Sequence, residues 1–218
     1  RALIDIITAQ SPHIEVRTNL VAIPILLISD KWIFYYWDLM RKDCPQINGG
    51  RKLVFNKNLQ DVKNNFINYW TFQKEFHKHL YRSKDKDDFI GLAKKLNDTI
   101  KDQPMKYIGS SMGDGEYSLF QFEKGKTTRT TLINGFLDLL NNSPKLLMKK
   151  DHYVTLKEYG GLFSGTNSII INWVDFIEKQ KAVKVAEGFN YNSEKNNEWE
   201  TVDSLKKLIK QHVDFNFV

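Results

Sequence analysis

The stretch VTLKEYGGLFSGTNSIIINWVDFIEKQKAVKV, residues 154–185, contains two amphipathic segments separated by a break with glycine. Thr155 and Glu158 have the T-x-x-E spacing of a capping box, in which each side chain satisfies a backbone N–H at the helix start. This spacing predicts a short helix that begins at Leu156 and is weakened by the glycine pair that follows. The stretch therefore predicts two helices joined by a tight turn.

The second helix of this pair is expected to follow Ser164 and Gly165, over residues 166–180. Its apolar residues recur at helical spacing and predict one buried face, made by Ile169, Ile170, Trp173, Phe176 and Ile177. Its polar residues are then left facing outward. They are Thr166, Asn167 and Ser168, with Asn172 one turn later.

Two strand-like segments around a polar loop follow, and a terminal helix ends the chain. Helix, helix and hairpin is the order of a winged helix, and residues 127–212 resemble the winged helix-turn-helix superfamily. The resemblance implies that the second helix lies in the major groove of double-stranded DNA. It implies contacts with bases or phosphates by Ser164, Thr166, Asn167, Ser168 and Asn172, and with the DNA backbone by Lys179, Lys184 and Lys195.

One departure from this pattern concerns charge. No Arg or Lys occurs between Glu158 and Glu178, although phosphate neutralisation by cations supplies much of the affinity for DNA. Winged helices also serve in protein interaction and dimerisation. A protein-interaction or assembly module without nucleic-acid binding, and a homodimer, therefore stay open as alternatives.

The formal net charge of +6 favours an anionic partner. The basic excess lies in the middle of the chain, where residues 41–106 hold 15 basic against 8 acidic side chains. Within it, residues 77–86 place basic side chains beside aromatic ones, a composition typical of nucleic-acid-facing surfaces. His77 and His79 are two apart in a predicted helix, so they point in different directions and do not predict a metal site.

The rest of the chain predicts a predominantly helical α+β fold, with residues 1–126 as a mostly helical domain with short strands and residues 127–218 as the winged-helix-like domain. Ser29 is expected to cap a buried helix. Helices are expected over residues 2–9, 58–81, 87–101 and 127–140, strands over 13–23 and 51–55, and a β-hairpin over 105–126.

An endonuclease is the enzyme alternative, because the stretch GDGEYSLFQFEKGK, residues 113–126, resembles the metal site of PD-(D/E)xK nucleases. Asp114, Glu123 and Lys124 are its candidate catalytic residues, with Mg²⁺ as the cofactor. The spacing departs from that pattern, because Gly125 occupies the position where lysine is required. Outside this alternative the sequence predicts no cofactor.

A single cysteine, Cys44, is compatible with a reducing cytoplasm. The apolar residues 20–40 contain Asp30, Lys31 and Asp38, whose charges disfavour a membrane helix. The chain starts at Arg1, which suggests a piece of a longer parent protein. Taken together, the sequence predicts a double-stranded DNA-binding protein of the cytoplasm, either a regulator or the recognition part of a restriction or mobile-element protein.

Overall fold

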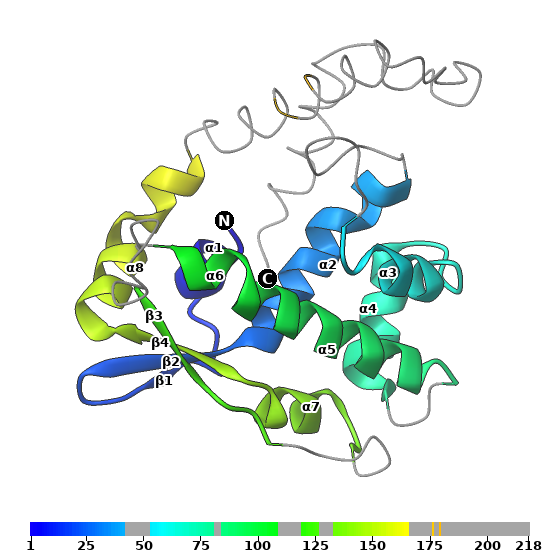
Figure 1. Cartoon of the computed structure of the whole chain (residues 1–218), viewed down its shortest axis with the longest axis horizontal. Helices are drawn as coiled ribbons and strands as arrows, with labels where there is room; N and C mark the ends of the chain where they lie inside the picture. Colours follow the sequence, from blue (N-terminus) through cyan, green and yellow to red (C-terminus); the bar gives the residue numbers. More distant parts are fainter. Residues whose placement is uncertain are drawn as a thin grey trace.

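The computed structural model describes residues 1–41, 53–80, 84–108, 119–126 and 133–165, together with positions 176 and 179. These residues form a mostly helical α+β fold with a small antiparallel sheet, as predicted (Figure 1). In chain order the elements are α1 (Ala2–Thr8), β1 (Glu15–Val16), β2 (Leu20–Pro24), α2 (Ile25–Arg41), α3 (Asn56–Lys63), α4 (Tyr69–Lys78), α5 (Lys86–Asp102), α6 (Pro104–Tyr107), β3 (Phe120–Glu123), α7 (Phe136–Asn142), β4 (Lys145–Lys149) and α8 (Lys150–Gly165).

The sheet has the strand order β1-β2-β4-β3, and every neighbouring pair is antiparallel. Val21 and Ile23 of β2 lie opposite Met148 and Leu146 of β4, and all four side chains are buried. Since successive side chains of a strand point to opposite faces, these residues form the inner face of the sheet. The inner face packs against α1 and α8 (Figure 1).

Two hydrophobic clusters make up the core. One gathers α3, α4, α5 and α7 around aromatic side chains such as Phe72 and Phe76. The other gathers α1, the inner face of the sheet, α6 and Tyr153 of α8. Helix α2 joins the clusters, because Ile25 and Ile28 belong to the second while residues further along α2 belong to the first.

The predicted cap at Ser29 is wrong, because α2 begins four residues earlier, directly after β2. The Ile25 N–H donates to the Pro144 carbonyl at 2.8 Å, so an external acceptor takes the place of a side-chain cap. Ser29 is fully buried inside α2, where its hydroxyl donates to Asn97 Oδ1 of α5 at 2.7 Å. The serine therefore ties two helices together within the core.

Several predicted elements differ in their bounds. The helix over 58–81 is two helices, because a capping box between Asn68 and Thr71 begins α4. The strand over 13–23 is a hairpin of β1 and β2, and residues 53–55 form a turn, with Phe55 buried against Trp32. The predictions over 2–9 and 87–101 are confirmed by α1 and α5.

The predicted hairpin over 105–126 is wrong where the structure describes it. Residues 104–107 form α6, and β3 pairs with β4, which follows about 20 residues later in the chain. The helix over 127–140 is shorter than predicted, because α7 begins at Phe136 and residues 133–135 are not helical.

The capping box at Thr155 and Glu158 is also wrong, because α8 is one continuous helix of 16 residues. The Thr155 hydroxyl donates to the Asp151 carbonyl at 2.9 Å, the bond of a threonine inside a helix. Gly160 does not end the helix: a Cβ there would lie 2.9 Å from Cγ2 of Ile4, so the glycine permits close packing of α8 on α1. The expected break at Ser164 and Gly165 is also wrong, because both residues belong to α8. Of the second helix and the wing only Phe176 and Lys179 are described, and both are helical; the other residues lie outside the described ranges.

The predicted division at residue 126 passes between β3 and β4, two neighbouring strands of one sheet. Helix α8, which follows that division, packs on α1 at the start of the chain. None of the described helices combines the length and the apolar character needed to cross a membrane.

Candidate functional site

Most of the predicted site residues lie outside the residues that the structure describes, namely Asp114, Thr166, Asn167, Ser168, Asn172, Lys184 and Lys195. Ser164 belongs to the last turn of α8, and Lys179 is helical and exposed. Glu123 ends β3, and Lys124 follows it with an exposed side chain. Of these residues, Glu123 makes ion pairs with side chains of the described structure.

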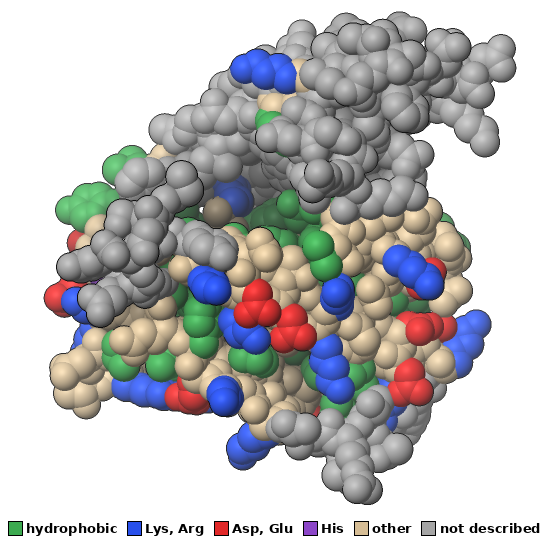
Figure 2. Space-filling model, in the orientation of Figure 1, with side chains coloured by type: hydrophobic (Ala, Val, Ile, Leu, Met, Phe, Trp, Pro, Cys, Tyr) green, Lys and Arg blue, Asp and Glu red, His purple; other side chains and the backbone are tan. Residues whose placement is uncertain are grey.

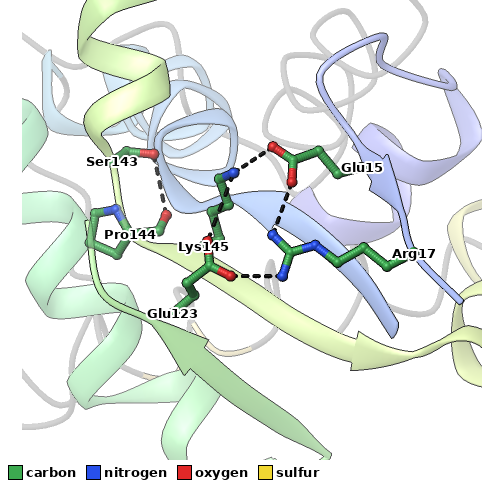
Figure 3. Close-up of polar contacts among 6 residues, drawn as sticks. All are labelled: Glu15, Arg17, Glu123, Ser143, Pro144 and Lys145. Atoms are coloured by element: carbon green, nitrogen blue, oxygen red, sulfur yellow. Dashed lines mark hydrogen bonds and ion pairs between the residues drawn. The ribbon is translucent and has the colours of Figure 1, made fainter. Parts of the chain in front are cut away.

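Glu123 belongs to a charged cluster with Glu15, Arg17 and Lys145 (Figure 3). The Arg17 guanidinium donates to Glu123 Oε2 at 2.7 Å and to Glu15 Oε2 at 2.9 Å. Lys145 Nζ donates to the other oxygen of Glu15 and lies 3.9 Å from Glu123 Oε1. The charged cluster thus joins two carboxylates through two cations.

The register of the sheet explains how residues from three strands meet. Glu15 lies opposite Ala22, and Glu123 lies opposite Lys145, so these side chains share the outer face of the sheet. Ala22 is small and fully buried. The longer side chains of Glu15 and Arg17 can therefore reach over β2 to those of β3 and β4 (Figure 3).

Hydrogen bonding within the charged cluster shifts the pKa values of its members. The bond from Lys145, and then that from Arg17, lowers the pKa of Glu15 below its ordinary value. The bond from Arg17 likewise lowers the pKa of Glu123, and the same carboxylates raise the pKa of Arg17. Both carboxylates are consequently ionised and charge-balanced at neutral pH.

This balance bears on the proposed Mg²⁺ ligand. A cation bound by Glu123 would have to compete with Arg17 and Lys145 for the same oxygens. Across the described ranges, no group of three or more His, Cys, Asp or Glu side chains is placed to hold a metal ion. Glu123, the described carboxylate of the endonuclease candidates, is therefore part of an ion-pair network.

A second polar group lies between α1 and α2. The Tyr35 hydroxyl donates to Asp5 Oδ2, which also accepts from Arg1 Nε at 3.1 Å. Burial raises the pKa of Tyr35. Burial also lowers the pKa of Lys31, and the negative charges of Asp5 and Asp30 partly offset this lowering. Sequence analysis missed this group because Asp5 and Tyr35 are 30 residues apart and no local pattern relates them.

A carboxylate–imidazole pair joins three helices. His77 Nε2 of α4 lies 3.2 Å from Asp30 Oδ2 of α2, and the His77 ring stacks on Phe136 of α7 at 4.1 Å. The 3.2 Å distance allows an ion pair if His77 is protonated, but in the described structure His77 Nε2 makes no hydrogen bond. His77 thus lies in a contact between helices. Its charged neighbour is Asp30 and not His79, the histidine two residues later in the sequence.

The comparison with protein families finds a match that covers most of the chain. A family model described as a domain of unknown function, DUF8808, matches residues 1–193. The chain belongs to the DUF8808 family. No curated protein and no solved structure matches the DUF8808 chain. The match runs through the whole described sheet and α8, across residue 126.

The surface of the DUF8808 chain carries mixed charge on the face that Figure 2 shows, where Lys and Arg side chains alternate with carboxylates. On α5 the exposed Lys94 and Lys95 are accompanied by the exposed Asp98 and Asp102. Helix α8 instead exposes apolar side chains. Val154, Tyr159 and Leu162 are 41%, 52% and 66% exposed.

Proposed function

We propose that the DUF8808 chain binds double-stranded DNA through the segment that follows α8. The observation that carries this proposal is the packed helix α8, which the structure describes as far as Gly165, immediately before the polar residues of the second predicted helix in the sequence. Packing of α8 on α1 through Gly160 fixes the helix from which that segment extends. A recognition helix requires such a fixed support to keep its register in the groove.

The proposed contacts divide into two kinds. Ser164, Thr166, Asn167, Ser168 and Asn172 would contact base edges or nearby phosphates, where Asn can pair bidentately with adenine. Lys179, Lys184 and Lys195 would contact phosphates and contribute most of the salt dependence. The net charge of +6 supports an anionic partner. Such a protein would act in the cytoplasm as a regulator or as the recognition part of a restriction or mobile-element enzyme.

Fluorescence anisotropy with a labelled random duplex pool tests the proposal. We expect binding that weakens steeply between about 50 and 200 mM salt. Asn167→Ala/Asn172→Ala should weaken binding, because it removes two amides from the outer face of the second helix. Replacing Lys179, Lys184 and Lys195 by Gln should reduce the slope of log K against log salt by about 2.7, since each phosphate contact contributes about 0.9.

The matched control is Asn64→Ala/Asn141→Ala, which removes two exposed amides from α3's end and from α7. This control should bind duplex as the unaltered chain does. Absence of duplex binding at low salt, or equal binding by the two asparagine pairs, would contradict a recognition role for the second helix.

An assembly module is the second candidate function, favoured by the exposed Val154, Tyr159 and Leu162 of α8. Apolar side chains gathered on one element are typical of protein contact surfaces. Sedimentation analysis of the unaltered chain and of Leu162→Glu separates the candidates. Self-association that Leu162→Glu abolishes, without duplex binding, would favour the module.

The endonuclease alternative predicts Mg²⁺-dependent cleavage of duplex DNA that Asp114→Ala and Glu123→Ala each abolish.

A further inference from the structure

Helix α4 presents an exposed face that none of the preceding sites uses. Its buried side chains, Tyr69, Phe72 and Phe76, point into the first hydrophobic cluster. Trp70, Lys74 and Lys78 recur every four residues on the opposite side and are exposed. Residues four apart on a helix are neighbours, so these three side chains form one row, which we call the α4 row.

Trp70 is held in place at one end of this row. The capping box between Asn68 and Thr71 fixes the first turn of α4, with Thr71 N–H donating to Asn68 Oδ1 at 3.0 Å. The Trp70 ring meets Tyr69 edge-on at 5.3 Å and lies 6.1 Å from Phe34. Even so, 47% of Trp70 is exposed. A ring that packs on neighbouring aromatic side chains and keeps about half of its surface exposed is suited to stacking with a further ring.

The two lysines give the row its charge. At 1.5 Å per residue, Lys74 and Lys78 lie about 6 and 12 Å along the axis from Trp70. The single carboxylate in the sequence of α4, Glu75, is half-buried and lies outside the row. On α5, by contrast, the exposed lysines alternate with exposed aspartates. The α4 row therefore combines an aromatic ring with two exposed cations.

We propose that the α4 row binds a single-stranded nucleic acid, with a base stacked on Trp70 and phosphates against Lys74 and Lys78. Unpaired bases offer their faces to aromatic side chains, whereas the bases of a duplex are already stacked on one another. Cations along the same line neutralise the backbone of the strand. This proposal uses other residues than the duplex contact proposed above, so either can fail without the other.

The test measures anisotropy of labelled oligo(dT) and oligo(U) with the full chain, with an unlabelled duplex as competitor. Trp70→Leu should weaken binding on the order of 10-fold, because base–aromatic stacking is lost. Trp70→Phe, which keeps an aromatic ring, should retain most of the affinity. Lys74→Gln/Lys78→Gln should reduce the salt slope by about 1.4, since each phosphate contact on a single strand contributes about 0.7.

The matched control is Lys94→Gln/Lys95→Gln, which removes the same charge from the exposed face of α5. It should leave the affinity for single strands nearly unchanged. Tighter binding of oligo(dT) identifies DNA as the partner, and tighter binding of oligo(U) identifies RNA; both support the proposal. Three results would overturn it: no binding of either strand at low salt, unchanged binding by a folded Trp70→Leu chain, or equal effects of the two lysine pairs.

Discussion

Glu123 illustrates how neighbouring side chains decide the role of a residue. In the sequence it stands beside Lys124 near the end of a strand-like segment, which suggests a metal site. In the structure its carboxylate accepts from Arg17, which is 106 positions earlier in the chain. A carboxylate already paired with two cations is a poor ligand for a third. Its chemistry therefore depends on a contact that no local pattern contains.

The charged cluster predicts an acid-sensitive contribution to stability. The pKa values of Glu15 and Glu123 are lowered in the folded state. The two carboxylates therefore stabilise the fold at pH values above their unfolded-state pKa of about 4.5, and this stabilisation is lost as the pH falls through their folded-state pKa values. Solvent exposure keeps the effect small. In urea unfolding from about pH 7 to pH 3, Glu15→Gln/Glu123→Gln should flatten the acid side of the stability curve.

The control for this experiment is Glu158→Gln, which alters an exposed carboxylate on α8. It should leave the acid dependence close to that of the unaltered chain. If the cluster variant and the control follow the same curve, the ion pairs do not contribute to folding.

At the scale of elements, α8 shows how a glycine pair can serve packing rather than termination. Both glycines lie inside one continuous helix, and their surroundings differ. A Cβ on Gly160 would meet Ile4, whereas one on Gly161 would have no neighbour within 4 Å. Gly125 plays a related part at the exit of β3, where a Cβ would lie 2.3 Å from the Asn142 carbonyl oxygen.

The same substitution, glycine to alanine, should change the free energy of unfolding in opposite directions at Gly160 and at Gly161. Gly160→Ala should lower the free energy of unfolding by about 1–3 kcal/mol, because the added methyl group overpacks the contact of α8 with α1. Gly161→Ala should raise it by up to about 1 kcal/mol through helix propensity alone. Thermal unfolding of both variants gives the measurement. The double variant Gly160→Ala/Ile4→Ala should lose less free energy of unfolding than the two single variants lose together. Strict additivity of the two losses would argue against the contact.

At the scale of the whole molecule, the two hydrophobic clusters are built from distant parts of the chain. Strand β4 lies between β2 and β3, and it covers the second cluster together with α1 and α8. Helices α2 and α5 contribute side chains to both clusters. Stability of the described part is therefore shared across residue 126, which the DUF8808 match also spans.

This sharing predicts the behaviour of fragments. A chain of residues 1–126 lacks β4, so β2 and β3 lose their common partner and the side chains opposite Leu146 and Met148 are uncovered. We expect this fragment to lose the cooperative thermal transition of the full chain, monitored by circular dichroism at 222 nm. A cooperative transition in the fragment alone would show that residues 1–126 fold independently.

The sequence by itself determined the features that depend on local spacing. Helices α1 and α5 follow from the recurrence of apolar residues such as Leu92, Leu96 and Ile100, since helical periodicity is visible in a short window. The mostly helical α+β class and the net positive charge also come from local or summed properties. These features require no knowledge of which segments meet.

Tertiary structure alone decided the strand partners, the start of α2, the continuity of α8 and the neighbours of Glu123. In each case the deciding contact is distant: Pro144 meets Ile25, Ile4 meets Gly160, and Arg17 meets Glu123. Local patterns state which face of an element is apolar, but burying that face depends on the elements that pack against it. That choice is made by the whole chain at once, because only the assembled core removes those faces from water.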